Sequence, residues 1–285
     1  MTKLKKSLET PKYIKRSAKL ISFFSDKLAV QFAMKLFITP IKFPTPNREL
    51  NMEKKSKIFP LELPKAKKDF MVYENGNGSK KALLIHGWNG RGTQLVSIAK
   101  ELVDLDYTVV SFDAPGHGKS SKNTTVMTDF IEAAFVLERY YKGFDLIIGH
   151  SLGAMSTINV LGRGFKAKKA ITIGSGDEII NIIKDFVKTI GLNEKIAHKL
   201  KEAFEAKYNK KIENYTVHEQ IKKIEIPIFI IHDKNDLDVP YSASENIHRN
   251  AKNSKLLLTE KLGHRKILGD SKVIAEIKEF VSKKI

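Results

Sequence analysis

Short apolar runs alternate with helix-length segments from residue 68 to the end of the chain, and this alternation constrains the fold most. Runs that indicate strands lie at 68–73, 82–85, 108–112, 146–148, 170–173, 226–231 and 256–259. Segments with apolar residues at helical spacing lie at 94–105, 126–141, 154–161, 243–249 and 273–281. Apolar strands alternating with helices predict an α/β fold, in which a mostly parallel central sheet is covered by helices on both faces.

One connection between strands is much longer than the others. The 51 residues between Gly174 and Ile226 contain two amphipathic patterns, at 178–190 and 194–208. Because loops of this length are uncommon in α/β units, we expect a helical cap insertion at about 177–220 over the carboxyl ends of the strands. The cap residues expected to face an apolar pocket are Ile179, Ile182, Ile183, Phe186 and Ile190.

The pentapeptide at 149–153, Gly-His-Ser-Leu-Gly, joins the expected strand at 146–148 to the expected helix at 154–161. A G-x-S-x-G sequence in this position is typical of a sharp turn that exposes the serine at the edge of the sheet. The N–H groups that follow the serine begin a helix and favour a nearby negative charge. Ser151 is therefore the candidate nucleophile.

A nucleophilic serine needs a base and an acid that orients the base. The loops after the last two expected strands supply both, because His264 lies in the second loop and acidic residues lie in each. The chain order of serine, acid and histidine is that of one known triad architecture. The acids that this reasoning leaves open are Asp233, Asp236, Asp238 and Glu260.

From about residue 68 onward, the chain resembles the α/β-hydrolase family. His-Gly-Trp at 86–88 resembles the family's oxyanion loop, and Asp-Ala-Pro-Gly-His-Gly-Lys-Ser at 113–120 resembles its D-x-P-G-x-G-x-S turn. The segment 232–240 resembles the H-x-x-x-D-x-x-V-P acid loop, and Gly263-His264 resembles the terminal histidine loop. The resemblance implies a triad of Ser151, Asp236 and His264.

The same resemblance implies an oxyanion hole formed by the backbone N–H groups of Trp88 and Leu152. Together these residues imply a serine hydrolase that cleaves a carboxylic ester with a small or medium-chain apolar acyl group. Serine at the nucleophile position argues against the dehalogenase and epoxide hydrolase branches. Lysophospholipase, thioesterase, peptidase and acyltransferase activities stay open, because one triad serves each of them.

Composition excludes several other kinds of site. The chain has no cysteine, so it has no disulfide, zinc–thiolate site, iron–sulfur cluster or thiol nucleophile. Gly118-Lys119-Ser120 mimics the end of a phosphate loop, but Asp113 stands where the first glycine is required, and neither H-E-x-x-H nor a complete G-x-G-x-x-G occurs. We expect no cofactor and no metal, and a cytoplasmic, reducing location.

Residues 1–67 lie outside the resemblance, apart from a possible first strand near 57–59, and we expect them to form a basic helical extension and linker before a hydrolase domain at 68–285. Residues 1–68 hold 17 Lys and Arg against 5 Asp and Glu, a net charge of +12 out of the chain's +18. Apolar residues at helical spacing predict an amphipathic helix or helix pair ending before Pro40. No motif for specific nucleic-acid binding accompanies this charge.

The helical segment at 1–44 has two interpretations. In the favoured one it packs on the hydrolase domain and buries Phe24, Leu28, Phe32 and Leu36. In the alternative it makes a peripheral membrane contact, with the apolar face in the headgroup region and the lysines drawn to anionic lipid. A membrane-associated lysophospholipase, or a non-enzymatic protein that binds through this segment, would use the second arrangement.

Overall fold

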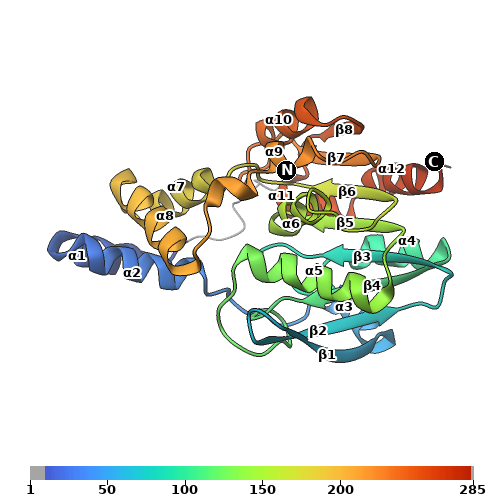
Figure 1. The fold of residues 1–285 in the computed structure, drawn as a ribbon, viewed down its shortest axis with the longest axis horizontal. Helices are drawn as coiled ribbons and strands as arrows, with labels where there is room; N and C mark the ends of the chain where they lie inside the picture. The colour runs from blue at the N-terminus through green and yellow to red at the C-terminus, as the bar shows by residue number, and fades with distance from the viewer. Residues whose placement is uncertain (1–9, 284–285) are drawn as a thin grey trace.

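A twisted sheet forms the middle layer of the molecule, with helices on both of its faces (Figure 1). The structure is a computed structural model and describes residues 10–283. Within these residues the sheet has eight strands in the order β1-β2-β4-β3-β5-β6-β7-β8. The pairs β1–β2 and β2–β4 are antiparallel, and the other neighbouring pairs are parallel. The expected α/β fold with a mostly parallel sheet is confirmed.

The strands are β1 (Lys57–Leu63), β2 (Lys68–Asn75), β3 (Lys80–Ile85), β4 (Tyr107–Asp113), β5 (Leu146–His150), β6 (Lys169–Ile173), β7 (Ile228–Asp233) and β8 (Ser254–Thr259). The longer helices are α1 (Lys12–Phe24), α2 (Asp26–Phe37), α3 (Asn47–Lys55), α4 (Val96–Asp104), α5 (Met127–Tyr141), α6 (Leu152–Leu161), α7 (Ile179–Thr189), α8 (Glu194–Tyr208), α10 (Ser242–Asn250) and α12 (Ser271–Ser282). Short helical turns are η1 (Ile212–Tyr215), α9 (Val217–Ile221), α11 (Gly263–Lys266) and η2 (Ile267–Gly269).

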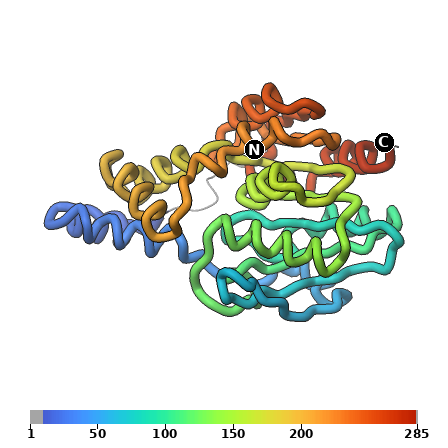
Figure 2. Tube along the Cα trace, in the orientation of Figure 1, coloured from blue at the N-terminus to red at the C-terminus, as the bar shows by residue number. Residues whose placement is uncertain are grey.

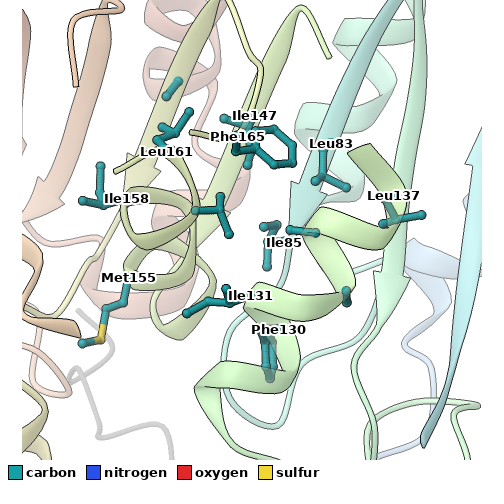
Figure 3. Packing of buried hydrophobic residues seen from close by; sticks show 14 of the residues in the cluster. Leu83, Ile85, Phe130, Ile131, Leu137, Ile147, Met155, Ile158, Leu161 and Phe165 are labelled. Carbon is teal, nitrogen blue, oxygen red and sulfur yellow. The ribbon is translucent and has the colours of Figure 1, made fainter. Parts of the chain in front are cut away.

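Two apolar cores fix the helices to the two faces of the sheet. On one face, side chains of β3 and β5 pack against α5 and α6, as Leu83, Ile147, Phe130 and Ile158 illustrate (Figure 3). On the other face, α4 and α12 pack against the same strands and their neighbours. The continuous apolar character of the central strands follows from this two-sided burial.

The sheet begins before the expected domain boundary at residues 67 and 68. Strand β1 (Lys57–Leu63) pairs with β2 along its whole length, from Lys57 opposite Glu74 to Leu63 opposite Lys68. Its sequence contains Pro60, and an edge strand tolerates proline because its outer N–H groups need no partner in the sheet. Residues 57–63 therefore belong structurally to the sheet.

The cap segment and the N-terminal helices form a separate lobe beside the sheet (Figure 2). Helix α2 packs against α7 and α8 of the cap, with Ala29, Val30 and Ala33 on the buried side. Small side chains at these positions let the helix backbones approach each other closely. The N-terminal pair is thus anchored on the cap.

The residues expected to be buried in the N-terminal helices are not those that the structure buries. Phe24 and Leu28 are 74% and 54% exposed, and Phe32 and Leu36 are only partly buried. The prediction that Phe24 and Leu28 are buried against the hydrolase domain is therefore wrong. Periodicity located the apolar positions of the helices. The side of α2 that is packed is the one with the small residues Ala29 and Ala33, and it packs against the cap.

A search of residues 10–283 for a helix both long enough and apolar enough to span a bilayer finds none.

Candidate active site

Ser151 occupies the turn between β5 and α6 with a backbone conformation that residues other than glycine rarely adopt, at φ 55° and ψ −118°. The two glycines of the motif make this turn sterically accessible. A Cβ atom on Gly149 would lie 2.3 Å from the carbonyl oxygen of Gly153, and one on Gly153 would lie 2.2 Å from that of Ile85. The turn holds Ser151 partly exposed at the carboxyl end of the strand, where it lines a cavity.

His264 and Asp236 meet at the carboxyl ends of β8 and β7. The Nδ1–H of His264 donates to Oδ2 of Asp236 at 2.6 Å, so Nε2 is the nitrogen left to accept a proton. Oδ1 of Asp236 accepts the backbone N–H groups of Asp238 and Val239 at 2.8 and 3.0 Å. Buried His232 lies behind the carboxylate, with Nε2 3.3 Å from its Oδ2.

The carboxylate of Asp236 is held in its ionised form. Burial raises the pKa of Asp236, but hydrogen bonds from His232 and His264 outweigh this effect and bring the pKa well below the ordinary aspartate value. A charged carboxylate is therefore available to orient His264 and to stabilise a positive charge on its ring.

The other acids considered from the sequence have different surroundings. Asp233 accepts the N–H groups of Leu262 and Gly263 at 3.1 and 2.9 Å, so it ties the histidine loop to β7. Glu260 is exposed and pairs with Lys234 at 3.0 Å. Asp238 lies near the Asp236–His264 pair, because ligand atoms of Asp236, Asp238 and His264 lie within 4.8 Å of one another. The 2.6 Å contact with Nδ1 distinguishes Asp236 from all three.

Trp88 and Leu152 line the same cavity as Ser151. Gly87 packs so tightly against the nucleophile turn that a Cβ atom there would lie 3.0 Å from both Nδ1 of His150 and Cβ of Ser151. This close approach brings the backbone of Trp88 to the cavity that Ser151 lines. Among the hydrogen bonds between described residues, none uses the N–H of Trp88 or of Leu152. Both N–H groups are therefore left to donate to a ligand in the cavity.

Two buried histidines connect the Trp88 loop to the turn at residues 113–120. The Nδ1–H of His86 donates to the carbonyl of Gly87 at 2.7 Å, and its Nε2 accepts the N–H of Ala114 at 3.1 Å. Nε2 of His117 similarly accepts the N–H of Asn89 at 3.2 Å. Both rings must be neutral to accept these hydrogen bonds. They act as cross-links between the two loops.

The cavity above Ser151 has a volume of about 980 Å³, near the upper end of the range for ligand pockets. Its apolar wall includes Phe37 from α2, Ile182 from α7 and Phe204 from α8, so the N-terminal helices and the cap both contribute to it. Four of the five expected cap residues line the cavity. Ile190 does not, because it is buried in the contact between the cap and the N-terminal helices.

Sequence comparisons give a family match over part of the chain. Residues 82–192 match the model of the family described as "Alpha/beta hydrolase family". The matched segment contains the Trp88 loop, the Ser151 turn and the elements between them, which include strands β4 and β5. This segment of the chain is therefore similar to the α/β-hydrolase family. No curated protein matches the sequence.

Solved structures with the same fold differ widely from this chain in sequence. The Pyrococcus furiosus esterase Pf2001 has a TM-score of 0.67 and 16% identity, over 86% of this chain and 98% of that one. A bromoperoxidase from Bacillus anthracis has a TM-score of 0.61 and 18% identity, over 80% and 100%. A membrane phospholipase A, described as a bacterial virulence factor, has a TM-score of 0.62 and 14% identity, over 94% and 95%. These similarities establish the fold.

The cap has a polar neck that sequence patterns did not indicate. Asp177, where the cap begins, accepts the backbone N–H of His218 at 2.8 Å and lies 2.8 Å from Nδ1 of the same residue, where the cap ends. Asn246 of α10 donates to Asp177 at 2.7 Å. No local sequence pattern links positions 41 residues apart, so sequence reasoning could not identify this pair. The neck fixes the cap over the cavity.

Acid should destabilise the protein, and we expect the free energy of unfolding to fall between pH 6.5 and 5. Burial lowers the pKa of His86 to about 4, and it also lowers the pKa values of His117 and His150 well below that of a free histidine. The unfolded chain then binds more protons than the folded one in this interval, so stability present above pH 6.5 is lost as the pH falls. His86 alone accounts for about 2 kcal/mol at pH 5.

Urea unfolding at pH 7, 6 and 5 measures this effect. His86→Gln should reduce the slope of the free energy against pH, whereas His198→Gln at an exposed position should leave the slope unchanged. A free energy of unfolding that stays constant from pH 7 to 5 contradicts the prediction. Lowered aspartate pKa values affect stability only at more acidic pH, so this interval isolates the histidines.

Proposed function

We propose that the protein is a serine hydrolase that cleaves carboxylic esters through Ser151, Asp236 and His264. The observation that carries this proposal is the 2.6 Å contact between Nδ1 of His264 and Asp236, beside a serine whose strained turn presents it to the same cavity. Solved structures of this fold include esterases, a phospholipase and a bromoperoxidase, so the fold alone does not select the reaction.

The proposed reaction is acyl transfer to water in two steps. Nε2 of His264 takes the proton of Ser151 Oγ as this oxygen attacks the ester carbonyl, and the Trp88 and Leu152 N–H groups bind the resulting oxyanion. His264 then gives the proton to the leaving alkoxide, and an acyl-serine ester forms. Water attacks this ester with the same proton transfers, which releases the carboxylic acid and restores Ser151. The Asp236 carboxylate stabilises the imidazolium in both steps.

Asp236, Asp238 and His264 could also be read as ligands of a cation, since their ligand atoms lie within 4.8 Å of one another. Both oxygens of Asp236 already accept hydrogen bonds, from His264 and from two backbone N–H groups. A carboxylate used in this way serves as a hydrogen-bond acceptor for histidine. This use of Asp236 favours the triad as the function of the site.

The apolar wall of the cavity indicates an acyl group longer than acetyl. Each methylene that enters the cavity contributes about 0.8 kcal/mol, which corresponds to a roughly fourfold rise in kcat/KM per methylene until the wall is covered. We expect kcat/KM on p-nitrophenyl esters to increase from acetate to medium-chain acyl groups. A profile independent of acyl length would contradict an apolar acyl site.

A matched pair of variants tests whether the cap determines this profile. Ile182→Trp adds volume to the cavity wall and should move the optimum to shorter acyl groups. Leu50→Trp makes the same chemical change at an exposed position on α3 and should leave the optimum in place. If both variants keep the parental optimum, the cap does not hold the acyl group.

A further inference from the structure

The N-terminal helices carry a set of large apolar side chains that no described part of the protein covers. Leu20, Phe23 and Phe24 of α1 are 62%, 82% and 74% exposed, and Leu28 at the start of α2 is 54% exposed. Tyr13 at the other end of α1 is 70% exposed. We call these five residues the exposed apolar face. Large apolar side chains gathered on one element indicate an interaction surface more strongly than single exposed residues do.

Helix α1 has two apolar sides, of which only one is used inside the protein. Ala18 is fully buried, and Ile14 and Ile21 pack against the cluster that joins α2 to the cap. Tyr13, Leu20 and Phe24 follow one another at spacings of seven and four, so they form a separate stripe along the helix. From Tyr13 to Phe24 the stripe is about 16 Å long. Packing on the cap therefore does not account for it.

The surroundings of the exposed apolar face are strongly basic. Lys12, Lys15, Arg16 and Lys19 are exposed on α1, and residues 10–25 contain no acid. None of these four cations forms an ion pair with a described residue. The nearest acid in the sequence, Asp26, is bound by Lys195 and Lys199 of α8 at 3.1 and 2.7 Å. The four positive charges thus remain available to a partner.

We infer that α1 and the start of α2 dock on an anionic phospholipid surface. A helix with aromatic and leucine side chains on one side and cations beside them enters the headgroup boundary and lies parallel to the membrane. A second copy of this chain is a poor partner, because two such faces would bring eight like charges together. This inference concerns binding only and does not depend on the activity proposed for Ser151.

The docked position would also give the cavity a defined relation to the membrane. Near its start, helix α2 carries Leu28 of the exposed apolar face. At its end, Leu36 and Phe37 line the cavity. The lobe that contains these helices extends away from the sheet, on the side where α1 and α2 lie next to α7 and α8 (Figure 1). A lipid surface at α1 would therefore meet this lobe before it meets the sheet.

Sedimentation with vesicles tests the inference on the full chain. We expect the parent to bind vesicles of phosphatidylcholine with 30% phosphatidylglycerol at about 50 mM salt, to bind pure phosphatidylcholine far less, and to dissociate as salt is raised. Changing Lys12, Lys15, Arg16 and Lys19 to glutamine should weaken binding by about 100-fold or more. Phe23→Ser with Phe24→Ser should weaken it by about tenfold or more.

Matched controls separate this surface from general charge and hydrophobicity. Glutamine at the exposed positions Lys65, Lys100, Lys166 and Lys272 changes the net charge equally and should keep most of the binding. Serine at exposed Tyr140 and Leu50 should do the same. Ser151→Ala should bind like the parent, which distinguishes a failure of docking from a failure of the proposed chemistry. Melting temperatures of all variants show whether folding is retained.

Three outcomes overturn the inference. The first is a parent that binds neither kind of vesicle at low salt. The second is binding that the α1 variants retain as fully as the controls do. The third is a parent that forms a dimer in light scattering and becomes a monomer in the Phe23→Ser, Phe24→Ser variant without binding vesicles, since the occupant would then be a second copy.

Discussion

Replacing Ser151 with alanine is expected to abolish ester hydrolysis and labelling by a fluorophosphonate while the fold stays intact. The side chain lies at the wall of the cavity, and the change removes only Oγ, the atom that forms the acyl bond. A loss on the order of 10⁵- to 10⁶-fold in kcat is expected for a nucleophile that works as part of a triad. Steady-state kinetics on a p-nitrophenyl ester, mass spectrometry of the labelled protein and circular dichroism measure the three properties.

A second serine provides the control for this experiment. Ser242 also lines the cavity, so Ser242→Ala should keep both labelling and activity. His264→Ala should lose about as much activity as Ser151→Ala, and the double variant should lose little more, because members of a triad act as a unit. Labelling of Ser151→Ala to the parental level would rule out Ser151 as the nucleophile.

Asp236→Asn is expected to reduce kcat by about 10⁴-fold without removing the side-chain volume. The amide cannot supply the negative charge that stabilises the His264 imidazolium, and it favours the wrong tautomer of the ring. Asp238→Asn keeps the Asp236 carboxylate beside Nδ1 of His264 and should therefore reduce kcat much less. The measurement is kcat on the same ester for both variants, at a pH where the parent is fully active.

The comparison between the two asparagine variants decides which acid serves the histidine. If Asp238→Asn proved damaging while Asp236→Asn stayed active, the assignment of Asp236 would be wrong in spite of its 2.6 Å contact. Unfolding curves should accompany the kinetics, because Asp236 also accepts the N–H groups of Asp238 and Val239, and a loosened loop could mimic a catalytic loss.

Sequence reasoning located the sheet and the loops of the site because both depend on local patterns. A strand buried on two faces must be apolar throughout, as Leu146–His150 is, and its end is marked by the turn residues that follow. Since parallel strands bring their carboxyl ends to one edge, Ser151, Asp236 and His264 could be expected near one another before any contact was known. Gly149 and Gly153 were expected for the same local reason, the tight turn.

The arrangement of the N-terminal lobe could not be predicted in this way. Helical periodicity identifies apolar positions but does not tell which side of a helix meets a partner, and α1 has two apolar sides. The small residues Ala29 and Ala33 made the closest contact possible, although a hydrophobicity pattern ranks them below Phe24 and Leu28. The bond between Asp177 and His218 was likewise out of reach, because it depends on how the cap folds back.

The contact between α2 and the cap has a consequence for synthesis on the ribosome. Ala33 of α2 and Leu200 of α8 belong to one buried cluster, although about 170 residues separate them along the chain. At about 5–20 residues per second, translation of that interval takes roughly 8–35 s. Throughout this time the buried side of α2 has no native partner, because α7 and α8 do not yet exist. The helices made first are therefore among the last to reach their final contacts, and a cell must keep them from aggregating until the cap emerges.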